Sequence, residues 1–536
     1  MKKSILTLLL LKLLSFSTEV SAQGKYNILW LSVEDLSPRF ACYGDSTVST
    51  PTIDRLAREG VVYDNAFSTY GVCAPSRHSI ITGMYPTSNG AMHMRTMVRT
   101  SALSDITDPE LLAIPTYEAV PLPEVKCFSE ILRQHGYYTT NNDKTDYQFA
   151  TPITAWDESS KKAHWKNRPE GMPFFSVFNC GYTHESQLFK QNFPKVVDRD
   201  KVEIPPFYPD TENVREAIAR QYDNIVAMDD WLGNYIDQLE EDGLLEKTII
   251  VFFSDHGDGL PRFKRWVYDT GTKIPLIIRW PGKRNAGTRN NELVSFVDFA
   301  PSMLSLAGVT IPEYMEGQAF LGEQKSVSRE YVFMFRDRMD PALETIRSVR
   351  GKQFRYVRNY RPDLPYFGYI PYRDRLSMME DLKELIKAPL VADYWQIQSQ
   401  YKPLEELYDT KNDPYETQNL ASDPKYFEKL KELRSVHDEW NKTHWDPGLI
   451  KETELIRKLW PPDGQQPRTI APEIKVENDK MYLDSSTDGA SIAYRFDGAD
   501  HWQLYSGPVS IAGHKKVEAL AIRIGWKESN KVVLEY

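Results

Sequence analysis

Uniformly apolar runs alternate with amphipathic segments through roughly the first three hundred residues. Three runs have the length and apolar character of buried strands: residues 26–33, 174–179 and 248–253. Elsewhere apolar residues recur at helical spacing and a glycine follows the last turn, which predicts helices over residues 52–59, 123–135 and 214–241. Residues 274–280 and 296–306 continue the sheet and add a helix. This alternation predicts a mostly parallel α/β sheet.

The pattern changes near residue 329 and again after residue 460. Prolines crowd residues 461–471, which indicates a linker. Beyond it, residues 472–536 form short alternating runs separated by turn residues such as Asp488-Gly489 and Asp497-Gly498. That pattern predicts a small all-β module.

The first residues have the features of a signal peptide. A basic start and a short apolar run lead to Val20-Ser21-Ala22, which suits cleavage after Ala22. We therefore expect residues 1–22 to be removed and the protein to be periplasmic or secreted. No later run reaches the length of a membrane span, so stable membrane insertion is not expected. The formal net charge is −10, which disfavours nucleic acid as a partner.

The most informative motif is Cys73-Ala74-Pro75-Ser76-Arg77, followed by Thr82-Gly83. With this Cys-x-Pro-Ser-Arg motif, the chain resembles the type I sulfatase family over roughly residues 26–460. The resemblance implies that a maturation enzyme oxidises Cys73 to formylglycine (3-oxoalanine) while the chain is unfolded. The aldehyde hydrate carries two oxygens, so one attacks the sulfate sulfur and the other expels sulfate when the covalent adduct collapses.

The resemblance also implies a fold and a division into domains. We expect an alkaline-phosphatase-like α/β domain over residues 23–328, with a mostly parallel sheet sandwiched by helices. A smaller subdomain with an antiparallel sheet and a closing helix is expected over residues 329–460. Residues 472–536 resemble the β-sandwich at the C-terminus of some bacterial chitobiases. A spacer or packing role is favoured for this module over sugar binding.

Two pairs of ionisable residues follow apolar strands, where sites of open α/β sheets gather. They are Glu34-Asp35 after the first strand and Asp255-His256 after the third. The resemblance implies that these four side chains hold a divalent cation beside residue 73, most simply Ca²⁺ because hard cations prefer carboxylate oxygens. Glu34 is one methylene longer than the usual aspartate, and the imidazole of His256 broadens the choice toward manganese or zinc.

The remaining catalytic roles also come from the resemblance. Arg77 is expected to hold the hydrate, while Lys144 and Lys264 bind sulfate oxygens. His184, in Thr-His-Glu-Ser, matches the residue that protonates the leaving group, which suits an imidazole. The family histidine two residues after the first lysine is absent, and Asp146 stands there.

Either Asp146 or His93 could replace that missing histidine as the base for sulfate release, and the sequence leaves both open. His93, Arg95 and Arg99 lie in a basic, polar stretch downstream of the motif. We interpret this stretch as part of the substrate pocket, with a surface loop as the alternative.

The sequence therefore predicts an exported, metal-dependent sulfatase acting on a sulfated oligosaccharide. The segments Thr-His-Glu-Ser and Lys-Arg-Trp-Val-Tyr-Asp resemble those of bacterial N-sulfoglucosamine sulfohydrolase-like sulfatases, which makes a heparan-type glycosaminoglycan the first substrate hypothesis. Two alternatives remain: a phosphonate or phosphate monoester hydrolase of the same superfamily, and a glycan-binding relative without activity.

Overall fold

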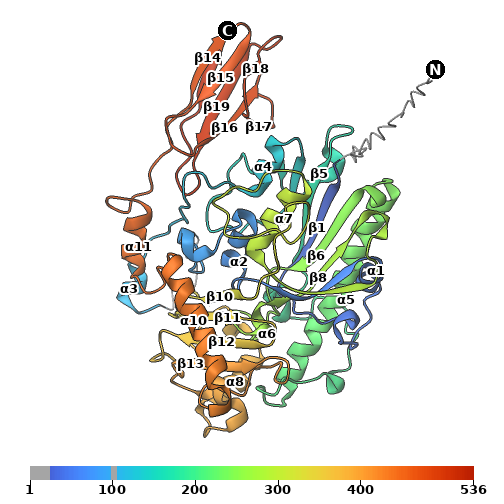
Figure 1. Cartoon of the computed structure of the whole chain (residues 1–536), viewed down its shortest axis with the longest axis vertical. Coiled ribbons are helices and arrows are strands. Elements are labelled where there is room, and N and C mark those ends of the chain that lie inside the picture. Colours follow the sequence, from blue (N-terminus) through green and yellow to red (C-terminus); the bar gives the residue numbers. More distant parts are fainter. Residues whose placement is uncertain (1–24, 98–105) are drawn as a thin grey trace, which may run out of the picture.

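The computed structural model describes residues 25–97 and 106–536. The expected signal peptide and Arg99 lie outside the described residues. A nine-stranded sheet forms the centre of the molecule, in the order β4-β3-β5-β1-β6-β8-β2-β7, with β9 pairing β2 (Figure 1). Its strands are β1 (Asn27–Val33), β2 (Val61–Phe67), β3 (Tyr138–Asn142), β4 (Glu158–Ser159), β5 (Phe174–Cys180), β6 (Thr248–Ser254), β7 (Lys273–Ile274), β8 (Leu276–Arg279) and β9 (Thr288–Ser295).

The mostly parallel sheet predicted from the sequence is confirmed. β1 runs parallel to β5 on one side and to β6 on the other, and both β1 and β6 are buried along their whole length. The predicted strand over residues 274–280 is split into β7 and β8, which run antiparallel to β2. Strands buried on both faces need continuous apolar side chains, which explains the uniform runs in the sequence.

Helices cover both faces of this sheet (Figure 1). The long helix α5 (Glu212–Glu241) and α1 (Pro51–Glu59) pack against the face that carries Leu29 and Leu31. On the opposite face, α2 (Cys73–Thr82), α4 (Phe128–Gln134) and α7 (Phe299–Leu306) cover Trp30 and its neighbours. Alternate residues of β1 thus point into two separate cores, as the pleat of a strand requires.

The helix expected over residues 123–135 is shorter in the structure. α4 begins only at Phe128, and residues 123–127 form a loop. Lys126 in this loop donates hydrogen bonds to the Gly489 carbonyl and to the Ser491 hydroxyl, 2.5 and 2.9 Å away. Contacts with a distant part of the chain therefore override the local helical pattern.

A four-stranded antiparallel sheet follows in the chain, and α10 (Phe427–Thr443) closes it. Its strands are β10 (Val332–Arg336), β11 (Ile346–Arg350), β12 (Phe354–Asn359) and β13 (Glu405–Asp409). The shorter helices are α3 (Pro109–Leu112), α6 (Asp269–Thr272), α8 (Met378–Lys387), α9 (Trp395–Gln398) and α11 (Glu452–Leu459). Asp269 of α6 receives hydrogen bonds from Arg350 and Arg355, which joins this sheet to the central domain.

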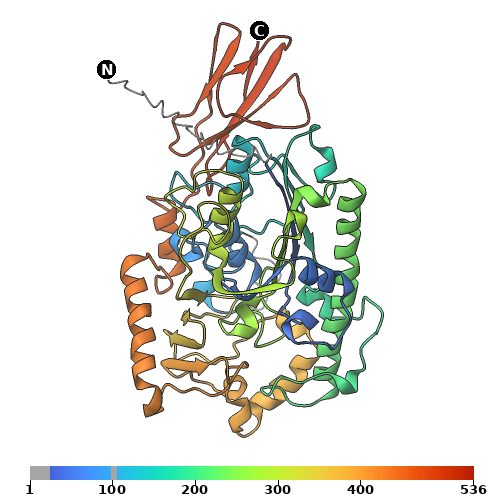
Figure 2. The ribbon, with the colours of Figure 1, turned by 45° about the vertical axis from the view of Figure 1, so that its right-hand side comes forward.

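The C-terminal residues form two small antiparallel sheets at one end of the molecule (Figure 2). Their strands are β14 (Glu473–Glu477), β15 (Lys480–Asp484), β16 (Ser491–Phe496), β17 (Gln503–Leu504), β18 (Val509–Ser510), β19 (Lys516–Ile522) and β20 (Val532–Glu535). Arg523 donates to the Pro121 carbonyl at 2.8 Å, and Trp460 donates to the Gly525 carbonyl at 2.9 Å. Among the described residues, no helix is long and apolar enough to cross a membrane.

Substitution of Gly489 tests how tightly residues 472–536 pack against the rest of the chain. Its φ is +70°, and a Cβ there would lie 2.0 Å from the Pro123 carbonyl oxygen. Gly489→Ala should add an overpacking cost of about 1–3 kcal/mol to a left-handed backbone cost of about 1–2 kcal/mol. Gly498 has a φ of +73° and nothing within 4 Å, so Gly498→Ala pays the backbone cost alone. Calorimetry should give the lower unfolding temperature for Gly489→Ala, and equal temperatures would show that the docking is loose.

Candidate active site

Two parallel strands deliver the acidic residues of the site to one edge of the sheet. Val33 of β1 pairs with Ser254 of β6, so the residues that follow each strand leave the sheet side by side. The Asp35 amide donates to the Asp255 carboxylate at 3.1 Å, and His256 Nε2 lies 3.1 Å from Asp35 Oδ1. These three side chains are fully buried.

Cys73 is the first residue of α2 and faces this edge. Its Sγ lies 3.3 Å from His256 Nε2, 3.6 Å from Lys264 Nζ and 3.8 Å from Asp35 Oδ1. Burial alone would raise the pKa of the Cys73 thiol, but nearby cations, led by Lys264, lower it to about 7. The surroundings of residue 73 thus favour a negatively charged atom at this point.

The serine and arginine of the motif hold α2 against the sheet edge. Ser76 Oγ donates to the Asp255 carbonyl at 2.6 Å. Arg77 Nε donates to the Asp255 carboxylate at 3.1 Å, and its Nη1 donates to Asn179 Oδ1 at 2.9 Å. All five motif residues are buried, so the Cys-x-Pro-Ser-Arg pattern also fixes the position of the helix.

Asp35, Cys73, Asp255 and His256 each offer a ligand atom, and these atoms lie within 4.8 Å of one another. His256 Nδ1 is 2.9 Å from the Gly257 carbonyl, which requires a proton on that nitrogen and leaves the Nε2 lone pair facing the group when the ring is neutral. Lys264 and the neighbouring histidines hold the pKa of Asp35 well below its usual range, against the effect of burial. This donor set fits a divalent cation.

Glu34 does not belong to that group of four. Its carboxylate accepts a hydrogen bond from Lys144 Nζ at 2.7 Å and lies 3.8 Å from His184 Nε2. With Cys73 and His184 it forms a second group of potential ligands. The longer side chain therefore reaches the lysine and the histidine that the sequence singled out.

A pocket of about 260 Å³ opens above Cys73. Lys144, Asp146, His184 and Lys264 all line it, as expected from the sequence. Lys264 Nζ lies 2.6 Å from Asp35 Oδ2, and Lys144 Nζ lies 3.8 Å from Asp146 Oδ2. The pocket therefore places two ammonium groups beside residue 73, which suits an anionic substrate.

The ring of His184 is oriented by the turn that follows it. Its Nδ1 accepts the Ser186 backbone N–H at 3.2 Å, so a neutral ring carries its proton on Nε2. Burial alone would lower the pKa of His184, but Asp35 and Glu34 among its neighbours raise it. His184 is therefore set up to donate a proton from Nε2, the atom near Glu34.

Comparison with known proteins identifies the family. The sulfatase family model matches residues 26–309, and the model of the N-sulphoglucosamine sulphohydrolase C-terminal region matches residues 262–367. An ulvan-active sulfatase of Formosa agariphila is 43% identical, covering 96% of this chain and 92% of that protein. This chain belongs to the sulfatase family. The family and enzyme class expected from the sequence are thus confirmed, and the protein is a sulfuric ester hydrolase.

Two more distant matches concern the sequence and the fold. Human N-sulphoglucosamine sulphohydrolase is 24% identical, covering 82% of this chain and 94% of that protein. A solved structure in complex with its substrate D-glucosamine-2-N,6-O-disulfate superposes with a TM-score of 0.53 at 18% identity, covering 78% of this chain and 98% of that chain. This last match supports the fold alone.

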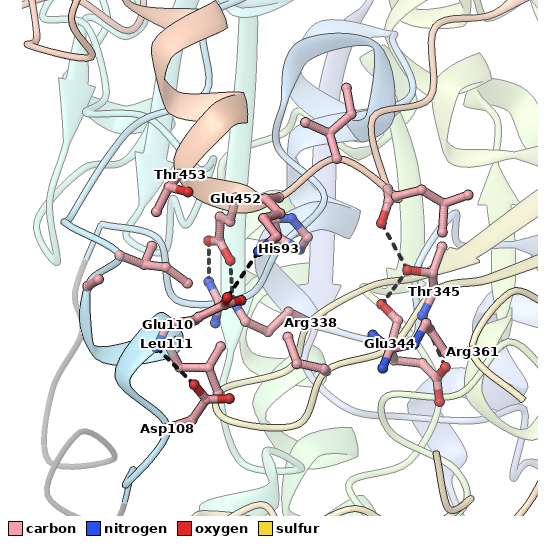
Figure 3. A pocket seen from close by; sticks show the side chains of 17 residues that line it. His93, Asp108, Glu110, Leu111, Arg338, Glu344, Thr345, Arg361, Glu452 and Thr453 are labelled. Atoms are coloured by element: carbon pink, nitrogen blue, oxygen red, sulfur yellow. Dashed lines mark hydrogen bonds and ion pairs between the residues drawn. The ribbon is translucent and has the colours of Figure 1, made fainter. Parts of the chain in front are cut away.

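The structure places His93 outside the pocket of this sulfatase. His93 lines a different cavity, beside Glu452 and Arg338 (Figure 3). It is buried, and burial lowers the pKa of the imidazole to about 4. The sequence alone could not show that its neighbour Arg95 points the other way, into the Cys73 pocket.

Other residues that line the sulfatase pocket were missed. Arg265 donates two hydrogen bonds to Glu185, of 2.8 and 2.7 Å, and the pair is buried. Glu185 directly follows His184 and Arg265 directly follows Lys264, and this position beside a predicted catalytic residue could have marked both as pocket residues. Asp340 lies 2.5 Å from Arg95 Nε, and the Arg95 guanidinium lies 5.3 Å from the Tyr372 ring centroid. No local pattern marks Asp340 or Tyr372, because both lie in loops far along the chain.

The buried Arg265–Glu185 pair allows a prediction of how substitutions change the free energy of unfolding of the sulfatase. Arg265→Met should cost about 3–5 kcal/mol, because it leaves the buried Glu185 carboxylate poorly compensated. The double variant Arg265→Met/Glu185→Met should recover most of that loss. Lys387→Met breaks the exposed pair with Glu384 and should cost about 0–1 kcal/mol. Denaturant unfolding measures all three, and a double variant as unstable as the single one would contradict the prediction.

Proposed function

We propose that this sulfatase removes sulfate groups from a sulfated glycan, with Cys73 acting as formylglycine. The observation that carries the proposal is the position of Cys73. It lies at the base of a pocket, within 3.6 Å of Lys264 Nζ and inside a group of four potential metal ligands. Nucleophile, cations and ligands for a divalent ion therefore meet at one point.

A sulfate ester of an ulvan-type polysaccharide is the first substrate hypothesis. The ulvan-active relative covers nearly the whole chain, whereas the human N-sulphoglucosamine sulphohydrolase shares only 24% identity. This supports ulvan over the heparan-type substrate expected from the sequence. A heparan-type glycan remains the second candidate, since residues 262–367 match the C-terminal model of the N-sulphoglucosamine enzymes.

Two groups would complete the site. When formed at residue 73, the aldehyde hydrate supplies a nucleophilic oxygen and a second oxygen for release, while a divalent cation supplies positive charge beside it. Asp35, Asp255 and His256 would hold that cation, most simply Ca²⁺, with residue 73. The motif is buried in the folded chain, so a maturation enzyme would need to act before folding. Export of the protein, after cleavage near Ala22, is a separate part of the proposal.

The other side chains bind the substrate and move protons. Lys144 and Lys264 would bind sulfate oxygens and stabilise charge that builds during the reaction. His184 would give its Nε2 proton to the departing sugar oxygen. Asp146 lines the pocket and His93 does not, which favours Asp146 as the base for release.

A substrate panel tests the proposal. Protein matured in a host that converts the cysteine is incubated with ulvan oligosaccharides, N- and O-sulfated heparan oligosaccharides, an aryl sulfate and an aryl phosphate. Release of inorganic sulfate from ulvan fragments supports the first hypothesis, and release from heparan fragments supports the second. Turnover of the phosphorus ester alone would overturn both.

Cys73→Ala should abolish turnover and leave substrate binding measurable, because both pocket lysines remain. Intact-mass measurement on the active native protein should show one sulfur and two hydrogens replaced by one oxygen. Cys127→Ala provides the matched control, since Cys127 is also buried but lies at the N-terminus of α4, within the hydrophobic core. An unmodified thiol in fully active protein would contradict the assignment of the nucleophile.

His184→Ala should slow sugar sulfates by at least about tenfold more than activated aryl sulfates, because only the sugar oxygen needs a proton on departure. Kinetic constants for both substrates measure this ratio. His135→Ala, at an exposed histidine that ends α4, should leave both rates unchanged. Equal losses for both substrates in His184→Ala would remove His184 from the acid role.

A further inference from the structure

Arg95 and Asp340 form a part of the Cys73 pocket that the proposed chemistry does not use. Both side chains line the pocket, and Arg95 Nε lies 2.5 Å from Asp340 Oδ1. The two residues come from different loops, one between α2 and α3 and the other after β10. The lysines and the histidine of the proposed mechanism already bind the sulfate and protonate the leaving group. This pair is therefore available to contact another part of the substrate.

Arg338 holds the backbone of both loops in place. Its Nη1 donates to the Met94 carbonyl at 3.0 Å and to the Asp340 carbonyl at 2.9 Å, and its own carbonyl accepts the Met94 amide at 2.9 Å. Its Nε and Nη2 donate to the Glu452 carboxylate at 2.6 and 2.7 Å. Arg95 thus projects from an anchored backbone, so less conformational entropy is lost when its side chain binds a ligand.

The guanidinium of Arg95 is open to solvent in the pocket. Its side chain is 29% exposed, whereas that of Asp340 is 2% exposed. Among the described residues, Asp340 is the only acidic partner of Arg95, and no hydrogen bond engages either Nη atom. None of the Arg95 nitrogens is a buried atom without a partner, so the unpaired Nη atoms keep accessible surface. With Nε beside Asp340, Nη1 and Nη2 remain as adjacent donors that suit a bidentate oxyanion.

Tyr372 links Arg95 to the side of the pocket where the sugar lies. The Arg95 guanidinium is 5.3 Å from the Tyr372 ring centroid, and the ring centroids of Tyr372 and His184 are 6.4 Å apart. His184 is the proposed proton donor to the departing sugar oxygen, so the sugar lies on this side of the sulfate. Arg95 is thus placed to meet the sugar, while Lys264, 3.6 Å from Cys73 Sγ, is placed to meet the sulfate.

We propose that Arg95 binds an acidic group of the glycan, a uronate carboxylate or a second sulfate, beside the ester that reacts. The free end of the guanidinium forms two charge-assisted hydrogen bonds with this oxyanion. Asp340 orients the guanidinium through Nε and leaves that free end unoccupied. The inference rests on the proposed glycan substrate and adds an acidic group at a defined place in it.

Matched substrates test the proposal. A sulfated oligosaccharide is compared with its carboxyl-reduced form and with a form that lacks the second sulfate, and kcat/KM is measured for each. In the unaltered protein, loss of the group that Arg95 binds should lower kcat/KM about tenfold or more, mainly through KM. Arg95→Gln should turn over this form and the complete oligosaccharide equally, because the contact is already lost. The form that reacts more slowly identifies the group as carboxylate or sulfate.

Two further variants separate a direct contact from a structural role. Arg95→Lys keeps the charge without the planar fork, so its dependence on the acidic group should fall in between. Arg375→Gln is the matched control, because the exposed Arg375 guanidinium lies 5.6 Å from the same Tyr372 ring but does not line the pocket. It should keep the dependence of the unaltered protein within about twofold. A purely structural role of Arg95 would lower kcat/KM for all forms by the same factor, which would overturn the proposal.

The proposed function fails separately, if no glycan releases sulfate while an aryl sulfate does. The same oligosaccharides are then used as inhibitors of aryl sulfate turnover. Inhibition of the unaltered protein that weakens about tenfold on loss of the acidic group, with no such change in Arg95→Gln, supports the subsite. Inhibition that does not depend on either acidic group overturns it.

Discussion

The parallel pairing of β1 with β6 is the constraint on which the site depends. Because Val33 lies opposite Ser254, the residues that follow both strands leave the sheet at the same edge, and the Asp35 amide donates a hydrogen bond to the Asp255 carboxylate there. A shift of one residue in either strand would turn its acid to the other face of the sheet. The apolar side chains of both strands prevent such a shift, because it would exchange the residues of two separate cores. The hydrophobic pattern thus fixes the position of the acids as well as the fold.

Charge balance explains why these buried acids are tolerated. Asp35 pairs with Lys264, Asp255 with Arg77, and Glu185 with Arg265, each within 3.1 Å. Lys264 Nζ also lies 3.9 Å from Glu185 Oε2, which links the first pair to the third, so a change in one alters the electrostatic environment of the other. The cations that compensate the acids also face the position of residue 73. Desolvation is therefore compensated during folding, before substrate arrives, which is what preorganisation of a catalytic site requires.

The sequence predicted those parts of the site that lie at the ends of apolar strands or inside a short motif. Asp35, Asp255 and Cys73 are of this kind, because register and local spacing determine where they lie. Their grouping with Lys264 depends on the loop after β6, and the family resemblance supplied that residue. Asp340 and Tyr372 depend on how the antiparallel sheet docks, and no nearby pattern encodes such docking. The same limit explains why α4 begins later than expected and why His93 and Arg95 line different cavities, since contacts distant in sequence decide both.

The position of Glu34 raises the question of whether Lys144 is still free to bind a sulfate group. An ammonium group has three N–H donors, and the Glu34 carboxylate at 2.7 Å takes one of them. The Asp146 carboxylate, 3.8 Å away, is too distant for a hydrogen bond. Two donors therefore remain for sulfate oxygens, and Glu34 fixes the direction in which they point. The same carboxylate lies 3.8 Å from His184 Nε2, so one acid lies close to both the proposed sulfate-binding lysine and the proposed proton donor.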